Sequence, residues 1–524
     1  MTFDRAAALE RLGAETFDVL VVGGGITGAG VALDAASRGL RTALVERDDF
    51  GSGTSSRSSK LVHGGLRYLG QGDYRLVAQA LAERQRLLEN APHLVRPLPF
   101  LVPSYGSRAR MRAVSSALWL YDLTGGFRIG HLHRRLSAAD ALAHTPALRS
   151  EGLVGAHLYL DAQADDARLT LAVARTAVLD HGAVAANHVG VTGLLIGAAG
   201  RVAGAAVQAD GRDLEVRATV VVNATGVWAD QLEDGGRVSI RPAKGVHITV
   251  PAHRVRTDVA LVVNVPSDGR SIFVVPWPGA DRVYIGTTDT DYDGPLDGPL
   301  CTVDDVTYLL DAVNDALTTD LTADDVVGTW AGLRPLVAGA SSARSADLSR
   351  RHRVSSSPQR VVTIAGGKLT TYRAMAADTV DEVEVVLGRR HVPCRTADMA
   401  LRGALRTAGG VDHLGGRYGR EARVVAAMVT ADSALGEPLV PTLPYLRAEA
   451  VYAARHEMAG SLDDVLARRT RALILARDAS VAAAGDVGRL LAPELGWDGA
   501  ETTAQVSAYV AGAETERLAA VAVS

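Results

Sequence analysis

The sequence predicts an α/β protein with three parts: a domain built on a parallel sheet, a domain built on an antiparallel sheet, and a helical C-terminal domain. Three observations support this fold class. Residues 17–39 have the pattern of a strand, a glycine-rich turn and a helix, residues 240–355 alternate as strands do, and helical periods dominate after about residue 395. A chain of 524 residues has room for two to four such domains.

The first element is an apolar run at residues 17–22, typical of a buried strand. Three glycines follow it with the spacing G-x-G-x-x-G: Gly23, Gly25 and Gly28. They allow a tight turn, a close approach of the backbone to a pyrophosphate, and packing of the next helix on the strand. A second strand at 40–45 ends at Glu46, the place of a carboxylate that accepts hydrogen bonds from ribose hydroxyls. These elements predict a bound adenine dinucleotide; the alternative is an ordinary turn between strand and helix.

The domain that holds this turn is expected to be discontinuous. Further strand patterns suited to its sheet recur along the chain, at 152–160, 202–209, 219–222 and 361–365. We therefore assign three segments to the nucleotide-binding domain: residues 1–75, about 150–235, and 355–394.

Two other domains account for the rest of the chain. Clear alternation at 247–250, 271–276 and 283–288 indicates a substrate-binding domain with an antiparallel sheet, formed by about 76–149 and 236–354. The C-terminal domain is assigned to 395–524, with helices expected at 447–458 and 461–484. Ser461 and Asp464 are spaced as a capping box at the start of the second of these helices.

The composition excludes several classes of protein. A net charge of −4, with both signs mixed along the chain, gives no basic surface for nucleic acid. Two cysteines, Cys301 and Cys394, cannot form a disulfide framework, so we expect a reducing cytoplasm. No apolar run approaches the length of a membrane span, so any membrane contact is expected to be peripheral. The motifs H-E-x-x-H, C-x-x-C and G-x-S-x-G are absent, and no metal is expected.

A single G-x-G-x-x-G implies that the dinucleotide itself performs the redox chemistry, which leaves bound FAD or an exchangeable NAD. A resemblance decides between them. Residues 53–69, Gly-Thr-Ser-Ser-Arg-Ser-Ser-Lys-Leu-Val-His-Gly-Gly-Leu-Arg-Tyr-Leu, resemble the signature of FAD-dependent, respiratory glycerol-3-phosphate dehydrogenases. Other segments are similar to that family in the same order: 221–228, 286–289, 331–336, 366–373, 461–471 and 494–497. Residues 406–446 carry no motif that we can place.

The resemblance implies a Rossmann-like FAD-binding domain of the glucose-oxidoreductase and D-amino-acid-oxidase type, with non-covalent FAD. It also implies oxidation of sn-glycerol 3-phosphate to dihydroxyacetone phosphate, with hydride transfer to flavin N5 and electrons passed to a quinone. Such an enzyme is cytoplasmic and lies peripherally on the inner face of the cell membrane. The sequence does not decide whether the chain forms a homodimer.

The motifs indicate a set of cofactor contacts. They are Gly23, Gly25, Gly28, Glu46, Thr54, Ser55, Ser56, Ser59, Lys60, Leu61, Ala224, Gly226, Trp228, Gly367, Thr370 and Thr371. The last three follow the strand pattern at 361–365, where the chain turns through two glycines into a helix. Such a turn directs backbone N–H groups toward the flavin edge where negative charge collects. Residues 366–370 are not a kinase phosphate loop, because Leu369 stands where Ser or Thr would hold magnesium.

Three cations in distant motifs are candidates to hold the substrate phosphate and to act in catalysis: Arg67, Arg334 and Lys368. A phosphate dianion in a half-buried cleft needs such partners because its uncompensated desolvation is costly. Tyr68 and Thr288 are further substrate-contact candidates.

His63 is the candidate general base, because imidazole titrates near neutrality and nearby Lys60 and Arg67 would lower its pKa. A purely structural role for His63 is the alternative. Three other histidines, His131, His133 and His247, lack this context and are expected to be surface or structural residues.

Two other functions remain open at this point. An oxidase of the same superfamily would pass electrons to oxygen and produce hydrogen peroxide, and a non-catalytic flavin-binding sensor would lack the three cations. The electron acceptor also bears on membrane attachment. The apolar run 117–121 is preceded by three arginines, Arg108, Arg110 and Arg112. A basic stretch followed by an apolar one is typical of segments that lie in the membrane interface. The alternative is a helix of the substrate domain with an exposed basic end.

Overall fold

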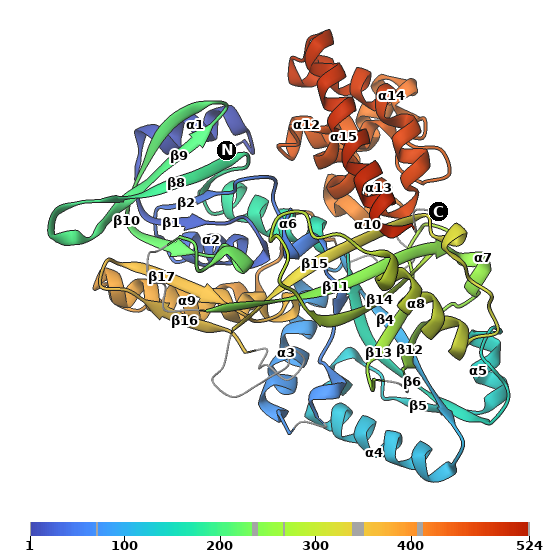
Figure 1. The fold of residues 1–524 in the computed structure, drawn as a ribbon. Coiled ribbons are helices and arrows are strands. Elements are labelled where there is room, and N and C mark those ends of the chain that lie inside the picture. The colour runs from blue at the N-terminus through green and yellow to red at the C-terminus, as the bar shows by residue number, and fades with distance from the viewer. Residues whose placement is uncertain are drawn as a thin grey trace.

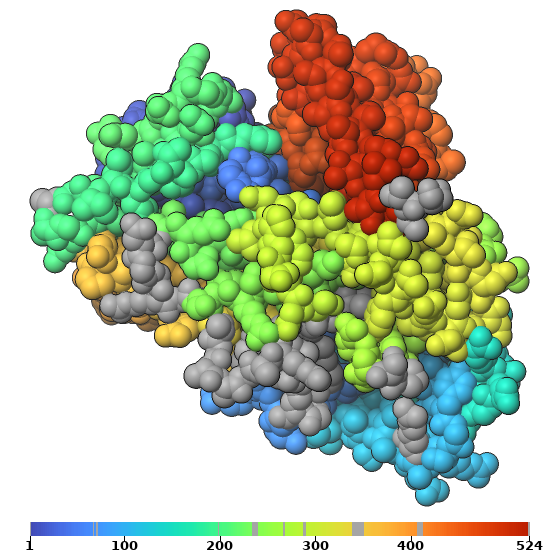
Figure 2. Space-filling model, in the orientation of Figure 1, coloured from blue at the N-terminus to red at the C-terminus, as the bar shows by residue number. Residues whose placement is uncertain are grey.

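A computed structural model describes residues 2–69, 72–232, 239–265, 268–337, 351–405 and 412–521. Its description excludes six side chains within these ranges: Arg67, Arg110, Ala198, Thr287, Thr288 and Asp289. Two sheets meet near the middle of the molecule, and the C-terminal helices α12, α14 and α15 pack together at one end, with α4 at the other (Figure 1). The space-filling view shows the C-terminal helices as a lobe that projects from the rest of the surface (Figure 2).

The first sheet contains the glycine-rich turn and has a parallel core. Its strands run in the order β16 (Arg353–Ser356), β17 (Val361–Ala365), β10 (Arg212–Asn223), β1 (Thr16–Val22), β2 (Thr42–Val45) and β7 (Val184–Ala186). Antiparallel strands β8 (Val189–Ile196) and β9 (Val202–Ala209) extend it from β10. Helices belonging to this domain are α1 (Arg5–Ala14), α2 (Ile26–Ser37), α6 (Asp166–Leu179) and α9 (Tyr372–Leu387). Strand β2 is apolar and wholly buried because helices cover a parallel sheet on both faces.

The second sheet is antiparallel except for one pair in the described ranges, β12 with β4. Its strands run in the order β15 (Gly328–Val337), β11 (Ile240–Pro251), β14 (Arg282–Asp291), β13 (Ser271–Pro276), β12 (Ala260–Asn264), β4 (Val95–Tyr105), β6 (Leu153–Ala164) and β3 (Leu61–Val62), with β5 (Arg134–Leu136) beside β6. Its helices are α3 (Tyr74–Asn90), α4 (Arg108–Thr124), α5 (Ala138–His144), α7 (Ala252–Val255) and α8 (Val303–Ala316).

One expected domain boundary differs from this topology. Strand β6 lies within the range 150–235 that the sequence assigned to the nucleotide-binding domain, yet it pairs along its length with β4 of the second sheet. Strand β3 lies in the range 1–75 that was assigned to the same domain, and it also belongs to the second sheet because it pairs with β6. Alternation within a strand reveals its buried face but not its partner, so the sequence pattern of β6 fits either sheet.

The C-terminal domain is helical, as expected. It contains α10 (Gly415–Tyr418), α11 (Ala422–Ala431), α12 (Arg447–His456), a π-helical turn (Asp464–Arg469), α13 (Ala472–Leu475), α14 (Arg477–Leu495) and α15 (Gly499–Ala520). Within the described ranges, short 3-10 turns lie at Thr54–Ser56, Leu66–Tyr68, Gly126–Ile129, Ala198–Gly200, Gly226–Trp228, Ala323–Asp325, Leu369–Thr371, Thr396–Asp398, Gly419–Glu421 and Ser433–Gly436. No helix in the described ranges is long and apolar enough to cross a membrane.

The helix expected at 461–484 is not continuous. Its capping box is present, because the Asp464 N–H donates to the Ser461 hydroxyl and the Ser461 N–H donates to the Asp464 carboxylate, each at 3.1 Å. The helix then breaks at Arg471, which has the left-handed φ of 61°. Periodicity alone gave no sign of this break, since an arginine is a good helix former.

The C-terminal domain is held to the nucleotide-binding domain by buried ion pairs. Arg168 contacts Glu457 at 2.7 Å and Arg175 contacts Glu421 at 2.6 Å, both from α6. His188 contacts Asp464 at 2.9 Å. Burial alone would lower the pKa of His188, but the hydrogen bond and charge of Asp464 outweigh burial and raise the pKa.

The His188–Asp464 pair predicts a pH dependence of stability. A histidine whose folded pKa exceeds the ordinary 6.5 stabilises the protein fully below that value, and this contribution is lost as the pH rises through the folded pKa. We expect the difference in thermal midpoint between the wild type and His188→Gln to be largest near about pH 6 and smaller near about pH 9. Thermal melts across this range test it, and a difference that does not change with pH would contradict it.

Candidate functional site

A cavity of about 990 Å³ lies between the two sheets. The first sheet contributes the residues at the carboxyl ends of its parallel strands, such as Val22, Val45 and Ala224. The second sheet contributes side chains such as Phe100 and His247. The carboxyl edge of a parallel sheet is where such folds bind ligands, because the strand order reverses there and opens a crevice.

The glycine turn leaves space that side chains would fill. Gly23 has a φ of 104°, and a Cβ on it would lie 2.7 Å from the Ala224 carbonyl oxygen. A Cβ on Gly28 would lie 1.8 Å from the Gly23 carbonyl oxygen, so glycine is needed for α2 to pack on β1. Gly25 caps α2 and lines the cavity, and a Cβ on it would lie 3.1 Å from the Ser55 hydroxyl, so the amino end of α2 faces the cavity beside that hydroxyl. Its N–H groups and positive dipole suit a pyrophosphate.

Glu46 follows β2 and lines the cavity. Its carboxylate accepts hydrogen bonds from the N–H groups of Gly24 at 2.6 Å and Asp48 at 2.9 Å. Burial raises the pKa of Glu46 to about 7, and the two backbone hydrogen bonds oppose this rise. The carboxyl group therefore sits beside the glycine turn, where ribose hydroxyls of an adenine dinucleotide would reach it.

Residues 53–59, here named the cofactor loop after their expected role, contribute most of their length to the cavity lining. The Thr54 hydroxyl donates to the Leu333 carbonyl at 2.5 Å, and the Ser55 hydroxyl accepts from the Ile26 N–H at 2.9 Å. The Ser59 hydroxyl lies 2.9 Å from Nε2 of His247. Each of these hydroxyls lines the cavity and is fixed by a neighbour from another element. Ser56 is buried and does not line the cavity.

Lys60 does not supply a cation to the cavity, contrary to the sequence-based expectation. Its ammonium lies 3.3 Å from the Asp166 carboxylate and donates to the Ser56 carbonyl at 3.1 Å. It also lies 4.7 Å from the ring centre of Trp330. Burial lowers the pKa of Lys60 to about 8, opposed by the charge of Asp166. Lys60 therefore links Ser56 of the cofactor loop to Asp166 and does not line the cavity.

The remaining predicted cofactor residues lie on the cavity wall, with one exception. Leu61, Ala224, Gly226, Trp228, Gly367 and Thr370 line the cavity. Trp228 has a buried indole N–H without a hydrogen-bond partner in the described structure, so a donor is available there. The Thr370 hydroxyl accepts from the backbone N–H of His63 at 3.2 Å. Thr371 does not line the cavity; its hydroxyl donates to the Lys368 carbonyl at 3.3 Å.

Four of the predicted catalytic or substrate residues share this cavity: His63, Tyr68, Arg334 and Lys368. They come from three segments of the chain. The Lys368 ammonium lies 3.8 Å from the ring centre of Tyr68, which is cation–π distance. The side chains of Arg67 and Thr288 lie outside the described part of the structure, although the backbone of Arg67 is in the turn Leu66–Tyr68.

His247 lines the cavity, which the sequence did not indicate. Its ring stacks on Trp330 at 4.6 Å. Burial, together with the charges of Lys60 and Arg334, holds the pKa of His247 well below its usual range, so the ring is neutral. A signal was present in the sequence, since His247 lies on a strand where alternate residues face the same side as Gly245.

Asp161 is a second residue that sequence reasoning missed. It lines the cavity and is buried, and its carboxylate accepts from Arg84 at 2.6 Å and from the Tyr121 hydroxyl at 2.8 Å. The N–H of Gly64 also donates to the Tyr121 hydroxyl at 3.0 Å and to Asp161 at 3.3 Å. This network fixes the backbone next to His63. An acid within an apolar strand was the available signal.

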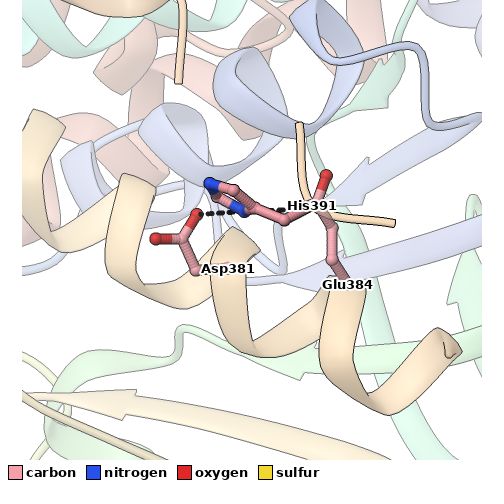
Figure 3. A group of neighbouring side chains, drawn as sticks. All are labelled: Asp381, Glu384 and His391. Carbon is pink, nitrogen blue, oxygen red and sulfur yellow. Dashed lines mark hydrogen bonds and ion pairs between the residues drawn. The ribbon is translucent and has the colours of Figure 1, made fainter. Parts of the chain in front are cut away.

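Asp381, Glu384 and His391 gather near the end of α9, with ligand atoms close enough for a metal (Figure 3). The His391 Nδ1 lies 3.0 Å from Glu384. However, Arg38 already contacts the same carboxylates, at 2.5 Å from Asp381 and 3.4 Å from Glu384. A guanidinium on these oxygens repels a second cation, so we assign the group as a structural ion-pair cluster.

Comparisons with known proteins agree with this geometry. A family described as FAD dependent oxidoreductase matches residues 18–373, and one described as C-terminal domain of alpha-glycerophosphate oxidase matches 363–502. A Mycobacterium tuberculosis protein named glycerol-3-phosphate dehydrogenase 2 is 43% identical across 98% of this chain and 91% of its own. The human mitochondrial glycerol-3-phosphate dehydrogenase is 39% identical across 92% of this chain and 71% of its own.

Solved structures extend the comparison to the fold. The glycerol-3-phosphate dehydrogenase of Bacillus halodurans, crystallised with FAD, superimposes with a TM-score of 0.80 at 32% identity and covers 99% of both chains. The L-alpha-glycerophosphate oxidase of Mycoplasma pneumoniae shares the fold, with a TM-score of 0.55 at 18% identity over 74% of this chain and 99% of its own. The glycine cradle, the carboxylate of Glu46 and the unpartnered Trp228 N–H fit an adenine dinucleotide, and the family identifies it as FAD.

Proposed function

Because the chain belongs to the FAD-dependent glycerol-3-phosphate dehydrogenase family, we propose that it oxidises sn-glycerol 3-phosphate to dihydroxyacetone phosphate and passes the electrons to a quinone. FAD, when bound, accepts the hydride at N5. The observation that supports this proposal most is that His63, Arg334 and Lys368 line the same cavity as the glycine turn. A proton acceptor and two cations thus line the space that would hold the cofactor.

Arg334 and Lys368 would hold the substrate phosphate, together with Arg67. Arg334 is half-buried and lines the cavity, and its charge is one cause of the low pKa of His247. Charge-assisted hydrogen bonds to a phosphate contribute roughly 1.5–3 kcal/mol each. Tyr68 would orient Lys368, since its ring lies under the ammonium.

His63 would take the hydroxyl proton of the substrate. The network of Thr370, Tyr121 and Asp161 fixes the backbone at residues 63 and 64, so the imidazole is presented from a rigid loop. His247 is a weaker candidate for this role because its Nε2 is already engaged with Ser59 and its pKa lies well below the usual range. A base works best when its pKa is near the working pH.

Steady-state assays test the proposed substrate. With FAD-loaded protein and a quinone analogue, we expect turnover of sn-glycerol 3-phosphate and little turnover of glycerol, which lacks the phosphate that Arg334 and Lys368 would bind. Equal turnover of both would contradict the phosphate assignment. The oxidase alternative is tested by replacing the quinone with oxygen and measuring hydrogen peroxide. This alternative is relevant because residues 363–502 match the C-terminal domain of alpha-glycerophosphate oxidase.

We also propose that α4 and the residues after it rest on the cytoplasmic face of the membrane, where quinones are found. Exposed apolar side chains gather on this segment: Trp119, Leu120, Leu123, Phe127 and Leu132. The same stretch of chain carries exposed arginines: Arg112, Arg128, Arg134 and Arg135. Apolar residues bordered by basic ones suit the interface of an anionic bilayer.

Vesicle binding tests this surface. Leu123 is 75% exposed, so we expect Leu123→Glu to weaken sedimentation with anionic vesicles by about tenfold while leaving activity with a soluble dye acceptor unchanged. Val385, 72% exposed on α9, is a matched control, and Val385→Glu is expected to leave vesicle binding unchanged. Equal binding by both variants would exclude this surface.

A further inference from the structure

Three arginines of the C-terminal domain reach the cofactor-binding parts of the first domain. Arg468 donates to Asp49 at 2.7 Å, and Arg469 donates to the same carboxylate at 2.6 and 2.9 Å. Asp49 is fully buried and lies three residues after Glu46. Two guanidiniums from the C-terminal domain therefore hold the segment that presents the ribose-binding carboxylate.

Arg471 holds the cofactor loop in the same way. It donates to Asp165 at 3.0 Å and to the Ser56 carbonyl at 3.3 Å, and it is hydrogen-bonded to Asp166. Asp166 in turn accepts from the Ser58 hydroxyl at 2.6 Å and pairs with Lys60. The buried carboxylate of Asp166 thus connects Arg471 to Ser58 and Lys60, while Arg471 itself holds the Ser56 carbonyl.

The backbone at this junction is held in unusual conformations. Lys60 and Arg471 both have left-handed φ values, 57° and 61°, and both side chains converge on Asp166. The turn Asp464–Arg469 that leads to Arg471 is π-helical. Such features persist only where surrounding contacts over-determine them, and they gather at functional sites.

We propose that Arg468, Arg469 and Arg471 are positioning residues for the cofactor: the C-terminal domain holds segments 46–49 and 56–60 in the shape that binds FAD. None of the three guanidiniums lines the main cavity, so they act through Asp49, Asp166 and Ser56. Because coupling between sites is reciprocal, bound FAD must stabilise the contact between the C-terminal domain and these segments.

The test compares two arginines at the same domain interface. Arg471→Met removes the contact to the cofactor loop, whereas Arg175→Met removes a buried ion pair with Glu421 that touches neither cofactor segment. We expect both variants to lower the unfolding midpoint of the apoprotein. Only Arg471→Met should raise the dissociation constant for FAD, by about ten- to a hundredfold in flavin-fluorescence titrations. Arg471→Lys, which keeps the charge but not the forked geometry, should restore binding in part.

Three results would overturn the proposal. The first is an equal dissociation constant for FAD in Arg471→Met and Arg175→Met, and the second is no recovery of binding in Arg471→Lys. The third needs no variant and therefore does not depend on whether Arg471→Met folds. In wild-type protein, FAD should slow hydrogen exchange of amides at 464–471 but not those of the outer helix α15, and unchanged exchange at 464–471 contradicts the coupling.

Discussion

Replacing Arg334 by alanine is expected to raise the Michaelis constant for sn-glycerol 3-phosphate about 30- to 150-fold, while the purified protein keeps its FAD. The magnitude follows from losing about 2–3 kcal/mol of charge-assisted hydrogen bonding to the phosphate, at 1.4 kcal/mol per factor of ten. The cofactor is expected to stay because the residues that would hold its adenosine and pyrophosphate parts, such as Glu46 and Gly25, lie on the other sheet. Initial rates against substrate concentration and the ratio of flavin to protein absorbance measure both quantities.

Two control variants sharpen the Arg334 experiment. Arg334→Lys keeps the charge but loses the planar fork, so an intermediate Michaelis constant is expected. Arg353 is exposed at the sheet edge outside the cavity, and Arg353→Ala should leave both quantities unchanged. If Arg334→Ala loses flavin instead, Arg334 is a structural residue and the phosphate assignment is wrong.

Replacing Gly28 by alanine is expected to abolish FAD binding. The new Cβ would lie 1.8 Å from the Gly23 carbonyl oxygen and 3.4 Å from the Ala224 side chain, so α2 must move away from the glycine turn. That movement displaces the N–H groups that face the pyrophosphate and lowers the free energy of unfolding by about 3 kcal/mol. The protein should purify without yellow colour and with a lowered thermal midpoint.

Gly13 provides the matched control for this substitution. It lies in α1, where an added Cβ meets only one Leu214 methyl group at 3.9 Å. Gly13→Ala should therefore keep its flavin and gain up to about 1 kcal/mol of stability, because alanine loses less backbone entropy in a helix. A yellow, stable Gly28→Ala protein would show that the turn tolerates a side chain and would contradict the assignment of the glycine turn as the pyrophosphate site.

The first domain was largely predictable because the residues that define its nucleotide-binding turn lie close together in the sequence. A strand, three spaced glycines, a helix and a terminal acid lie within 17–46, and the structure has β1, α2 and β2 in that order. Strands β9, β13 and β17 have the expected bounds, because their apolar periods are regular and turn residues flank them. The resemblance to a family supplied the cofactor and the substrate class, which local patterns left open between FAD and NAD.

The structure differs from the expectations, or adds to them, where distant contacts decide the outcome. Lys60 stands in a polar loop beside cofactor residues, yet Asp166, more than a hundred positions along the chain, draws its ammonium away from the cavity. Strand β6 lies in the range assigned to the nucleotide-binding domain but pairs with β4 of the second sheet, because alternation does not identify a strand's partner. His247 lacked a sequence context because its neighbours in space, Ser59 and Trp330, belong to other segments. Each case depends on tertiary packing rather than on local propensity.

An anaerobic titration of the FAD-loaded protein with sn-glycerol 3-phosphate tests the central claim most directly. The visible absorbance of the flavin reports whether electrons reach the cofactor from this substrate, independently of any electron acceptor. The account predicts bleaching that saturates with substrate in the wild type and needs much higher concentrations in Arg334→Ala. A flavin that stays oxidised in the wild-type protein at saturating sn-glycerol 3-phosphate would contradict the proposed function.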